Sequence, residues 1–139
     1  MRVIIINGPN LNLLGKRNTD IYGDISFDNY FEVLKAEFQS IQLEYFQSNL
    51  EGELINKLQE IGFSYDYIIF NAGGYTHSSV SIADCIEAIK TPVIEVHLSN
   101  IYSREEFRRK SLLAPFCKGS IVGLGLDGYK LALNYLIDR

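Results

Sequence analysis

The stretch RVIIIN, residues 2–7, decides the fold and is followed at once by the turn sequence Gly8-Pro9. Its apolar residues form a continuous β-branched run, which is typical of a strand buried on both faces of a parallel sheet. Further short runs, each bounded by Gly, Pro, Asn or Asp, predict four more strands: Leu43–Gln47, Tyr67–Asn71, Val93–His97 and Ser120–Gly123.

Apolar residues at helical spacing separate these strands. They recur every three or four residues over 27–38, 54–61, 82–89 and from about 129 to 136. A further helix is expected after the fourth strand, where Ser103-Arg-Glu-Glu106 indicates a capping box. This alternation predicts a single α/β domain over residues 1–139, a flavodoxin-like three-layer sandwich whose five-stranded parallel sheet has the order 2-1-3-4-5.

The composition is that of a globular domain with a small-molecule ligand. With 139 residues, of which 47% are hydrophobic and 22% charged, the chain can build a full core. Its longest apolar runs fall far short of the ~20 residues that cross a bilayer, and the first breaks at residues 7–9, unlike a secretory signal. The net charge of −4 disfavours nucleic acid, and Cys85 and Cys117 are too few for a disulfide scaffold. We therefore expect a cytoplasmic protein with neither a nucleic-acid nor a membrane partner.

Polar residues follow three of the predicted strands directly. They are residues 7–12 (NGPNLN), 71–77 (NAGGYTH) and 97–100 (HLSN). In an open parallel sheet, ligands bind at the carboxyl ends of the strands, near the point where the strand order reverses. The sequence therefore predicts a ligand crevice between these three segments.

The chain has two histidines, His77 and His97, and both lie at this predicted crevice. Histidine titrates near neutral pH, so it can donate a proton to a leaving hydroxyl. Metal binding is the competing use of paired histidines. The nearest further ligands are Asp84 and Glu95, without the spacing of a metal motif, so no metal is expected.

Arginines add an anion preference to the crevice. Arg17 falls in the loop after the first strand, and Arg104 and Arg108 stand four apart, where they share one face of the expected helix. With Arg109 and Lys110 they could instead form a solvated basic face. Their place beside residues 97–100 favours an anionic substrate.

Residues 15–23 (GKRNTDIYG) form a long polar loop of the kind that closes over a ligand as a lid. Tyr22 in this loop could pack against the domain or act as a base. Ionising a phenol at neutral pH requires about 4 kcal/mol of differential stabilisation. One guanidinium about 4 Å away supplies roughly that much at an effective dielectric near 20, and Arg17 and Arg104 are the candidates.

Taken in order, these motifs resemble the type II 3-dehydroquinases over essentially Arg2 to Leu136. The matching segments are 7–15 (NGPNLNLLG), Arg17 with Tyr22-Gly23, 47–49 (QSN) with 51–52 (EG), 71–79 (NAGGYTHSS), 95–100 (EVHLSN) with 104–108 (REEFR), and 123–129 (GLGLDGY). Each segment alone is weak evidence, whereas all of them in order are highly specific.

The resemblance implies a flavodoxin-like subunit of a dodecamer that dehydrates 3-dehydroquinate to 3-dehydroshikimate without a cofactor, in the shikimate pathway or in quinate breakdown. Tyr22 would remove the C2 proton, and Arg17 would lower the pKa of Tyr22. Asn10 would lie beside the developing enolate, and His97 would protonate the departing C1 hydroxyl.

The resemblance also implies which residues hold the substrate. Leu98 and Ser99 would bind its carboxylate through backbone N–H groups and the serine hydroxyl, and Arg104 would close over the site with the lid. The other substrate-binding residues would be Asn71, Gly73, His77, Asp84 and Arg108. Asp84 could also orient the His77 imidazole.

This chain departs from the family in the lid, where Asn18-Thr19 replace the usual Glu-Pro and should leave the open loop more flexible. The main alternative is a flavodoxin-like module that binds FMN or a phosphosugar. That module would need a Ser/Thr/Gly-rich loop after the first strand, where residues 7–12 contain proline and leucine. A two-component receiver would need acidic strand ends, and a hydrolase would need a G-x-S-x-G turn. A purely structural subunit would leave the polar strand ends unexplained.

Overall fold

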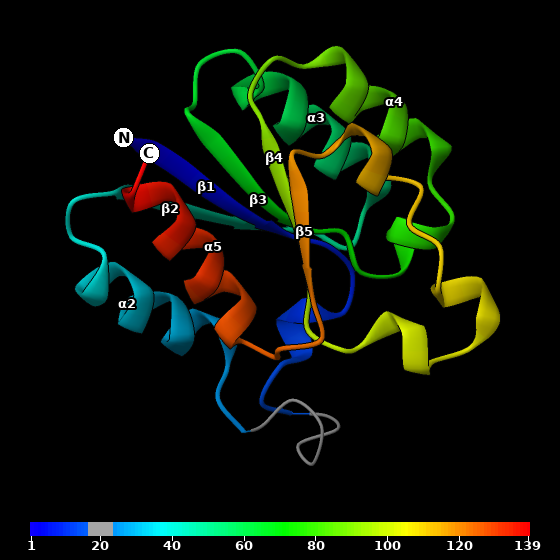
Figure 1. Ribbon diagram of the computed structural model, residues 1–139, viewed down its shortest axis with the longest axis horizontal. Coiled ribbons are helices and arrows are strands. Elements are labelled where there is room, and N and C mark those ends of the chain that lie inside the picture. Colours follow the sequence, from blue (N-terminus) through cyan, green and yellow to red (C-terminus); the bar gives the residue numbers. More distant parts are fainter. Residues whose placement is uncertain (17–23) are drawn as a thin grey trace.

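The computed structural model describes residues 1–16 and 24–139. Its centre is a five-stranded parallel sheet in the order β2-β1-β3-β4-β5, which confirms the predicted topology (Figure 1). The strands are β1 (Arg2–Asn7), β2 (Gln42–Gln47), β3 (Tyr67–Asn71), β4 (Val93–His97) and β5 (Gly119–Val122). Only β2 and β5 differ from the predicted ranges: β2 begins one residue earlier, and β5 begins and ends one residue earlier.

Helices cover both faces of the sheet, so the molecule has three layers (Figure 1). One face carries α2 (Phe27–Glu37) and α5 (Asp127–Ile137), and the other carries α3 (Glu51–Ile61) and α4 (Val80–Ala88). None of the described helices is both long enough and apolar enough to span a membrane.

The continuous apolar run of β1 is explained by burial on both faces. Val3 and Ile5 belong to the core under α2 and α5, whereas Ile4 and Ile6 belong to the core under α3 and α4. Successive strand side chains point to opposite faces, so each core takes alternate residues of the same strand. Burying both sets holds β1 inside the sheet, between β2 and β3.

The prediction of a helix after β4 is wrong. The segment between β4 and β5 instead forms three short 3-10 helices: η3 (Ile101–Ser103), η4 (Glu106–Arg108) and η5 (Ala114–Phe116). The predicted capping box is absent from it. Asn100 caps η3 by accepting a hydrogen bond from the Tyr102 N–H at 3.1 Å, and the Ser103 hydroxyl donates to the Asn100 carbonyl at 2.9 Å.

The charge content of this segment explains the difference. Residues 104–110 read REEFRRK, in which the single apolar residue, Phe107, is 64% exposed. An α-helix of a globular protein draws most of its stability from an apolar face packed on the core, and this segment has none. Arg104 accordingly has an extended backbone, with φ −102° and ψ −168°.

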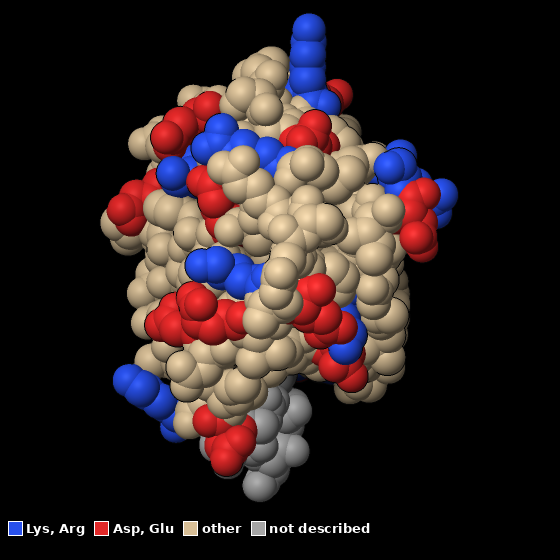
Figure 2. Space-filling model, turned by 90° about the vertical axis from the view of Figure 1, so that its left-hand side faces the viewer, with Lys and Arg blue, Asp and Glu red and all other residues tan. Residues whose placement is uncertain are grey.

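The surface shown in Figure 2 intersperses Lys and Arg with Asp and Glu over its described part. This mixture agrees with a chain of net charge −4 and with surface pairs such as Arg2–Glu44 at 2.8 Å and Lys130–Glu37 at 2.8 Å.

Candidate active site

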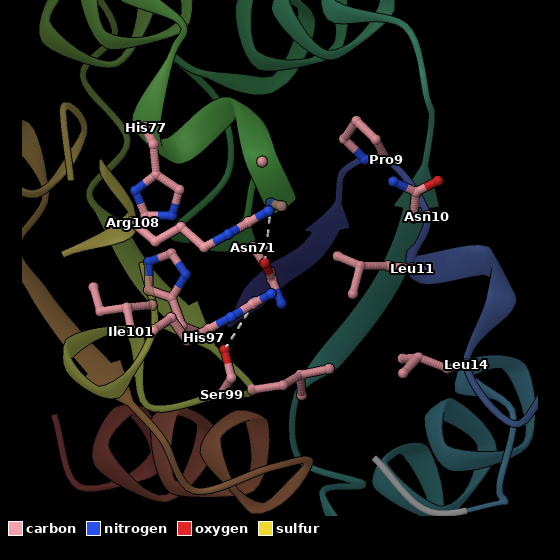
Figure 3. Close-up of a pocket in the computed structure, with 14 residues that line it drawn as sticks. Pro9, Asn10, Leu11, Leu14, Asn71, His77, His97, Ser99, Ile101 and Arg108 are labelled. Carbon is pink, nitrogen blue, oxygen red and sulfur yellow. Dashed lines mark hydrogen bonds between the residues drawn. The ribbon is translucent and has the colours of Figure 1, made fainter. Parts of the chain in front are cut away.

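A cavity of about 260 Å³ opens at the carboxyl ends of β1, β3 and β4 (Figure 3). The segment after β1 contributes Pro9, Asn10, Leu11 and Leu14 to its wall. β3 and η2 (Gly73–His77) contribute Asn71, Gly73, Gly74 and His77. β4 and the segment after it contribute His97, Leu98, Ser99, Ile101, Arg104 and Arg108. The cavity thus lies where the three polar strand ends meet.

The structure brings together most of the residues that the sequence suggested. Asn10, both histidines and both arginines of residues 104–108 line this cavity, together with Asn71, Gly73, Leu98 and Ser99. Asp84 does not line it and is exposed on α4. Arg17 and Tyr22 lie outside the described residues.

The segment after β1 is held by close backbone contacts. A Cβ on Gly8 would stand 2.5 Å from the Ala72 carbonyl oxygen, so only glycine fits there. Asn10 has a left-handed backbone with φ 71°, a conformation that asparagine tolerates better than most residues. Its N–H donates to Oδ1 of Asn49 at 3.1 Å, and Gln47 donates to the Gly8 carbonyl at 3.1 Å. The end of β2 therefore braces the cavity wall, a contribution that the sequence analysis missed.

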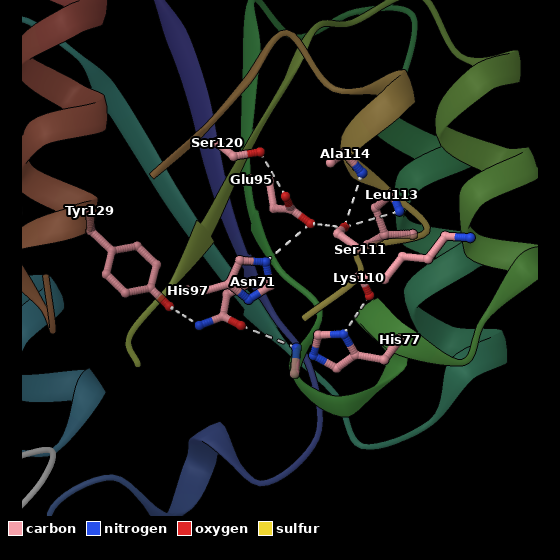
Figure 4. Close-up of polar contacts among 11 residues, drawn as sticks. Asn71, His77, Glu95, His97, Lys110, Ser111, Leu113, Ala114, Ser120 and Tyr129 are labelled. Atoms are coloured by element: carbon pink, nitrogen blue, oxygen red, sulfur yellow. Dashed lines mark hydrogen bonds and ion pairs between the residues drawn. The ribbon is translucent and has the colours of Figure 1, made fainter. Parts of the chain in front are cut away.

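The imidazole of His97 contacts the buried carboxylate of Glu95 (Figure 4). Its Nε2 lies 3.1 Å from Oε2 of Glu95, and the two side chains are 6% and 3% exposed. The two groups form an ion-pair contact, and Nε2 of His97 has no hydrogen-bond partner among the described residues. Glu95 also accepts hydrogen bonds from the hydroxyls of Ser111 and Ser120, the latter at 2.7 Å.

These contacts keep Glu95 ionised. Burial alone raises the pKa of this carboxyl, but the contacts with His97, Ser111 and Ser120 outweigh burial and hold its pKa below the ordinary value. A carboxylate beside an imidazole stabilises the protonated ring. The pair is therefore suited to hold a proton at the cavity and to release it to a ligand.

His77 is oriented by a backbone carbonyl. Its Nδ1 lies 2.8 Å from the carbonyl oxygen of Lys110, which can only accept, so Nδ1 carries the proton. The Lys110 carbonyl thus occupies the orienting position that the sequence analysis offered to Asp84. The rings of His77 and His97 stack with centroids 6.3 Å apart.

Arg104 and Arg108 reach the same cavity without sharing a helix. Arg104 donates through Nη1 to the Ser99 hydroxyl at 3.5 Å, and Nε of Arg108 donates to Glu105 at 2.8 Å. Their convergence comes from the path of the 3-10 segment rather than from the helical spacing that predicted it.

From the sequence alone, Glu95 stands out only as a possible metal ligand. The useful signal was its spacing of two residues from His97, which puts both side chains on one face of β4. Ser111 and Ser120 carried no comparable signal, because they join the site from 16 and 25 residues away. Among the described residues, no three His, Cys, Asp or Glu side chains are grouped so that they could hold a metal ion.

A parallel sheet of this order, with helices on both faces and a polar cavity at the strand ends, defines the flavodoxin-like α/β class. The family model for dehydroquinase class II matches residues 1–137, so the chain belongs to that family.

Relatives and solved structures agree. A 3-dehydroquinate dehydratase from Campylobacter jejuni is 52% identical over 140 aligned positions, covering 99% of this chain and 88% of the relative. One from Bacillus pumilus is 51% identical, covering 98% and 94%. The crystal structure of a type II dehydroquinase from Butyrivibrio crossotus superposes with a TM-score of 0.93 at 43% identity, covering 99% of this chain and 97% of that one. The alternative of an FMN or phosphosugar module is not favoured.

Proposed function

We propose that this class II dehydroquinase dehydrates 3-dehydroquinate to 3-dehydroshikimate in the cavity of Figure 3, through an enolate and without a cofactor. The observation that carries the proposal is that Asn10, His97 and the two arginines 104 and 108, from separate strand ends, line one cavity. The reaction needs a base, a site for a developing negative charge and an acid. The residues of this family member supply all three.

The first step removes the C2 proton, which is acidic because C2 is adjacent to the C3 ketone. Tyr22 is the proposed base, and Arg17 the proposed cation that lowers the pKa of its phenol; both lie outside the described residues. The electron pair of the broken C–H bond moves onto the ketone oxygen as an enolate. Asn10, on the cavity wall, is placed to stabilise this oxygen directly or through a water.

The second step expels the C1 hydroxyl. The enolate reforms the ketone, its electron pair forms the C1=C2 double bond, and the C1–O bond breaks as the hydroxyl takes a proton from His97 and leaves as water. Glu95, ionised beneath His97, orients the imidazole through its contact with Nε2. The buried carboxylate thus acts through His97 and does not touch the substrate.

The remaining residues are proposed to hold the substrate. The N–H groups of Leu98 and Ser99 and the Ser99 hydroxyl bind its carboxylate, and the Ser99 hydroxyl is already in contact with Arg104. The substrate ring is proposed to contact the other predicted binding residues that line the cavity: Asn71, Gly73, His77 and Arg108. Each of these assignments follows from the resemblance and is supported by its place on the wall.

The proposed assembly is a dodecamer in the cytoplasm. Asp84 is exposed on α4 and does not line the cavity of its own chain, so its predicted role in substrate binding would need the cavity of a neighbouring subunit. Val80, Tyr102 and Phe107 are each more than 60% exposed in the single chain, and subunit contacts would cover such apolar side chains. Both cysteines are free thiols, as in a reducing compartment.

The test is the appearance of the conjugated enone, followed by ultraviolet absorbance, when the protein is mixed with 3-dehydroquinate. We expect turnover to persist in EDTA and after borohydride treatment, because neither a metal nor a lysine imine takes part. Tyr22→Phe should fold normally and lose most turnover, because it has no ionisable hydroxyl. Wild-type rates in Tyr22→Phe would remove Tyr22 from the role of base.

A further inference from the structure

We propose that Tyr129, held by Asn7, is a positioning residue that fixes the donor and acceptor directions of Asn71 in the cavity. The inference rests on the proposed function, in which Asn71 binds the ring hydroxyls of the substrate. Neither Tyr129 nor Asn7 lines the cavity.

The three side chains form a buried chain of hydrogen bonds that runs from α5 to the cavity wall. Tyr129 lies in the first turn of α5, and both Tyr129 and Asn7 are 0% exposed. Asn71, at the end of β3, is 3% exposed and does line the cavity (Figure 3), and its contact with Tyr129 is drawn in Figure 4. In so buried a place, bulk water cannot replace a missing partner.

The direction of each hydrogen bond follows from the single proton of a hydroxyl. Tyr129 donates that proton to Oδ1 of Asn7 at 2.7 Å. Its oxygen can then only accept from Asn71, so Asn71 must turn its Nδ2 towards it, and that bond is 3.1 Å. Burial raises the pKa of Tyr129 above its ordinary value of 10.0, so the hydroxyl keeps its proton at neutral pH.

A second contact fixes the same amide from its other end. The Gly73 N–H donates to Oδ1 of Asn71 at 3.1 Å. If the amide turned over, its oxygen would face the Tyr129 oxygen and its NH2 would face the Gly73 N–H. An acceptor would then face an acceptor at Tyr129, and a donor would face a donor at Gly73. The two contacts therefore select one orientation of the Asn71 amide.

This orientation determines what a ligand meets. One N–H of the Asn71 amide and one lone pair of its oxygen are not used by Tyr129 or Gly73. A ring hydroxyl can accept from that N–H or donate to that lone pair. Losing the orientation would therefore weaken binding of substrate and transition state alike.

Tyr129→Phe removes only the hydroxyl and tests the proposal through the split between KM and kcat. We expect KM for 3-dehydroquinate to rise about fivefold with kcat changed less than about twofold, the pattern of lost uniform binding. Tyr30→Phe is the matched control, because its hydroxyl donates to the Leu126 carbonyl next to α5 at 2.9 Å and has no contact with Asn71. Tyr30→Phe should lower the melting temperature and leave KM unchanged.

A double-mutant cycle separates positioning from a general loss of structure. Asn71→Ala should raise KM about tenfold. Adding Tyr129→Phe to it should raise KM by less than about twofold more, because no amide remains to be positioned. Independent, multiplying effects in this cycle would overturn the proposal.

Asn7→Leu provides a second route that keeps Tyr129. The substitution removes the group that accepts the proton of the Tyr129 hydroxyl. The hydroxyl then donates towards Asn71 and favours the orientation in which the amide oxygen of Asn71 faces Tyr129. KM should therefore rise as in Tyr129→Phe. This variant also decides the matter if Tyr129→Phe does not fold. No turnover by the wild-type protein would overturn the proposed function and this inference together. If the wild-type protein turns over 3-dehydroquinate and both Tyr129→Phe and Asn7→Leu keep the wild-type KM, this inference alone is overturned.

Discussion

Glu95 and His97 stand two residues apart on β4, so both side chains leave the same face of the strand and meet under the cavity. The carboxylate is buried, and it is tolerated because Ser111 and Ser120 donate hydrogen bonds to its two oxygens. At the residue scale, the proposed acid of the reaction therefore depends on a charge that a substrate would not touch.

Glu95→Gln keeps the shape of this side chain and removes its charge. We expect kcat to fall about 10- to 100-fold, as for other supporting partners of functional histidines, with KM nearly unchanged. Glu44→Gln is the control, since Glu44 also accepts a hydrogen bond from a hydroxyl, that of Tyr65, but does not line the cavity.

His97→Ala separates the two proposed steps. The variant should still exchange the C2 proton of 3-dehydroquinate with solvent, because Tyr22 remains, while dehydration falls by about 100-fold or more. Proton exchange is measured by nuclear magnetic resonance in deuterated water, and dehydration by enone absorbance. If both activities disappeared, His97 would act before the enolate forms.

At the element scale, the cavity is built by segments that follow separate strands and press directly on one another. Gly8 packs against the Ala72 carbonyl, and Gly73, with φ 61°, would place a Cβ 3.0 Å from the Pro9 carbonyl oxygen. These glycines let the segments after β1 and β3 approach closely enough to present Asn10 and Asn71 to one ligand. Loop contact, rather than the sheet alone, sets the shape of the site.

Gly8→Ala should therefore force the two segments apart. A Cβ 2.5 Å from the Ala72 oxygen cannot be accommodated by rotating a side chain. We expect a loss of about 1–3 kcal/mol in the free energy of unfolding and a clear fall in kcat/KM. Gly52→Ala in α3 is the control, because no atom lies within 4 Å of its Cβ and it should keep wild-type stability or gain slightly. Equal behaviour of the two variants in urea unfolding would contradict this account.

At the scale of the whole molecule, the two apolar cores on either side of the sheet carry the fold, and the buried charge of Glu95 lies in the middle of β4. Because the pKa of Glu95 in the folded chain is below its ordinary value of 4.5, the ionised form stabilises the fold above that pH. That contribution is lost as the pH falls through the lowered pKa.

The acid sensitivity of the molecule should therefore change when Glu95 is replaced. We expect the wild-type protein to lose stability as the pH falls below about 4.5, and Glu95→Gln to lose less over the same pH range. Urea unfolding at several pH values measures both curves. Parallel curves would show that Glu95 has the same pKa in the folded and unfolded chain.

The amino-acid sequence by itself determined the parallel sheet, its strand order and the meeting of three polar strand ends. These follow from local patterns: β-branched runs, helical spacing and the polar residues that close each strand, which act through neighbours in the chain. The prediction of a helix after β4 was wrong. Residues 103–110 contain capping residues and charges that suit a helix, but they have no apolar face that could pack on the core.

Only the tertiary structure decided which buried side chains support the site. Asn71 and Tyr129 lie 58 residues apart, and Glu95 lies 25 residues from Ser120. No local period records such partners, because each pair meets only after the helices have packed on the sheet. Periodicity reports whether a residue is buried, whereas the hydrogen bonds of a buried polar group depend on what the rest of the chain places beside it.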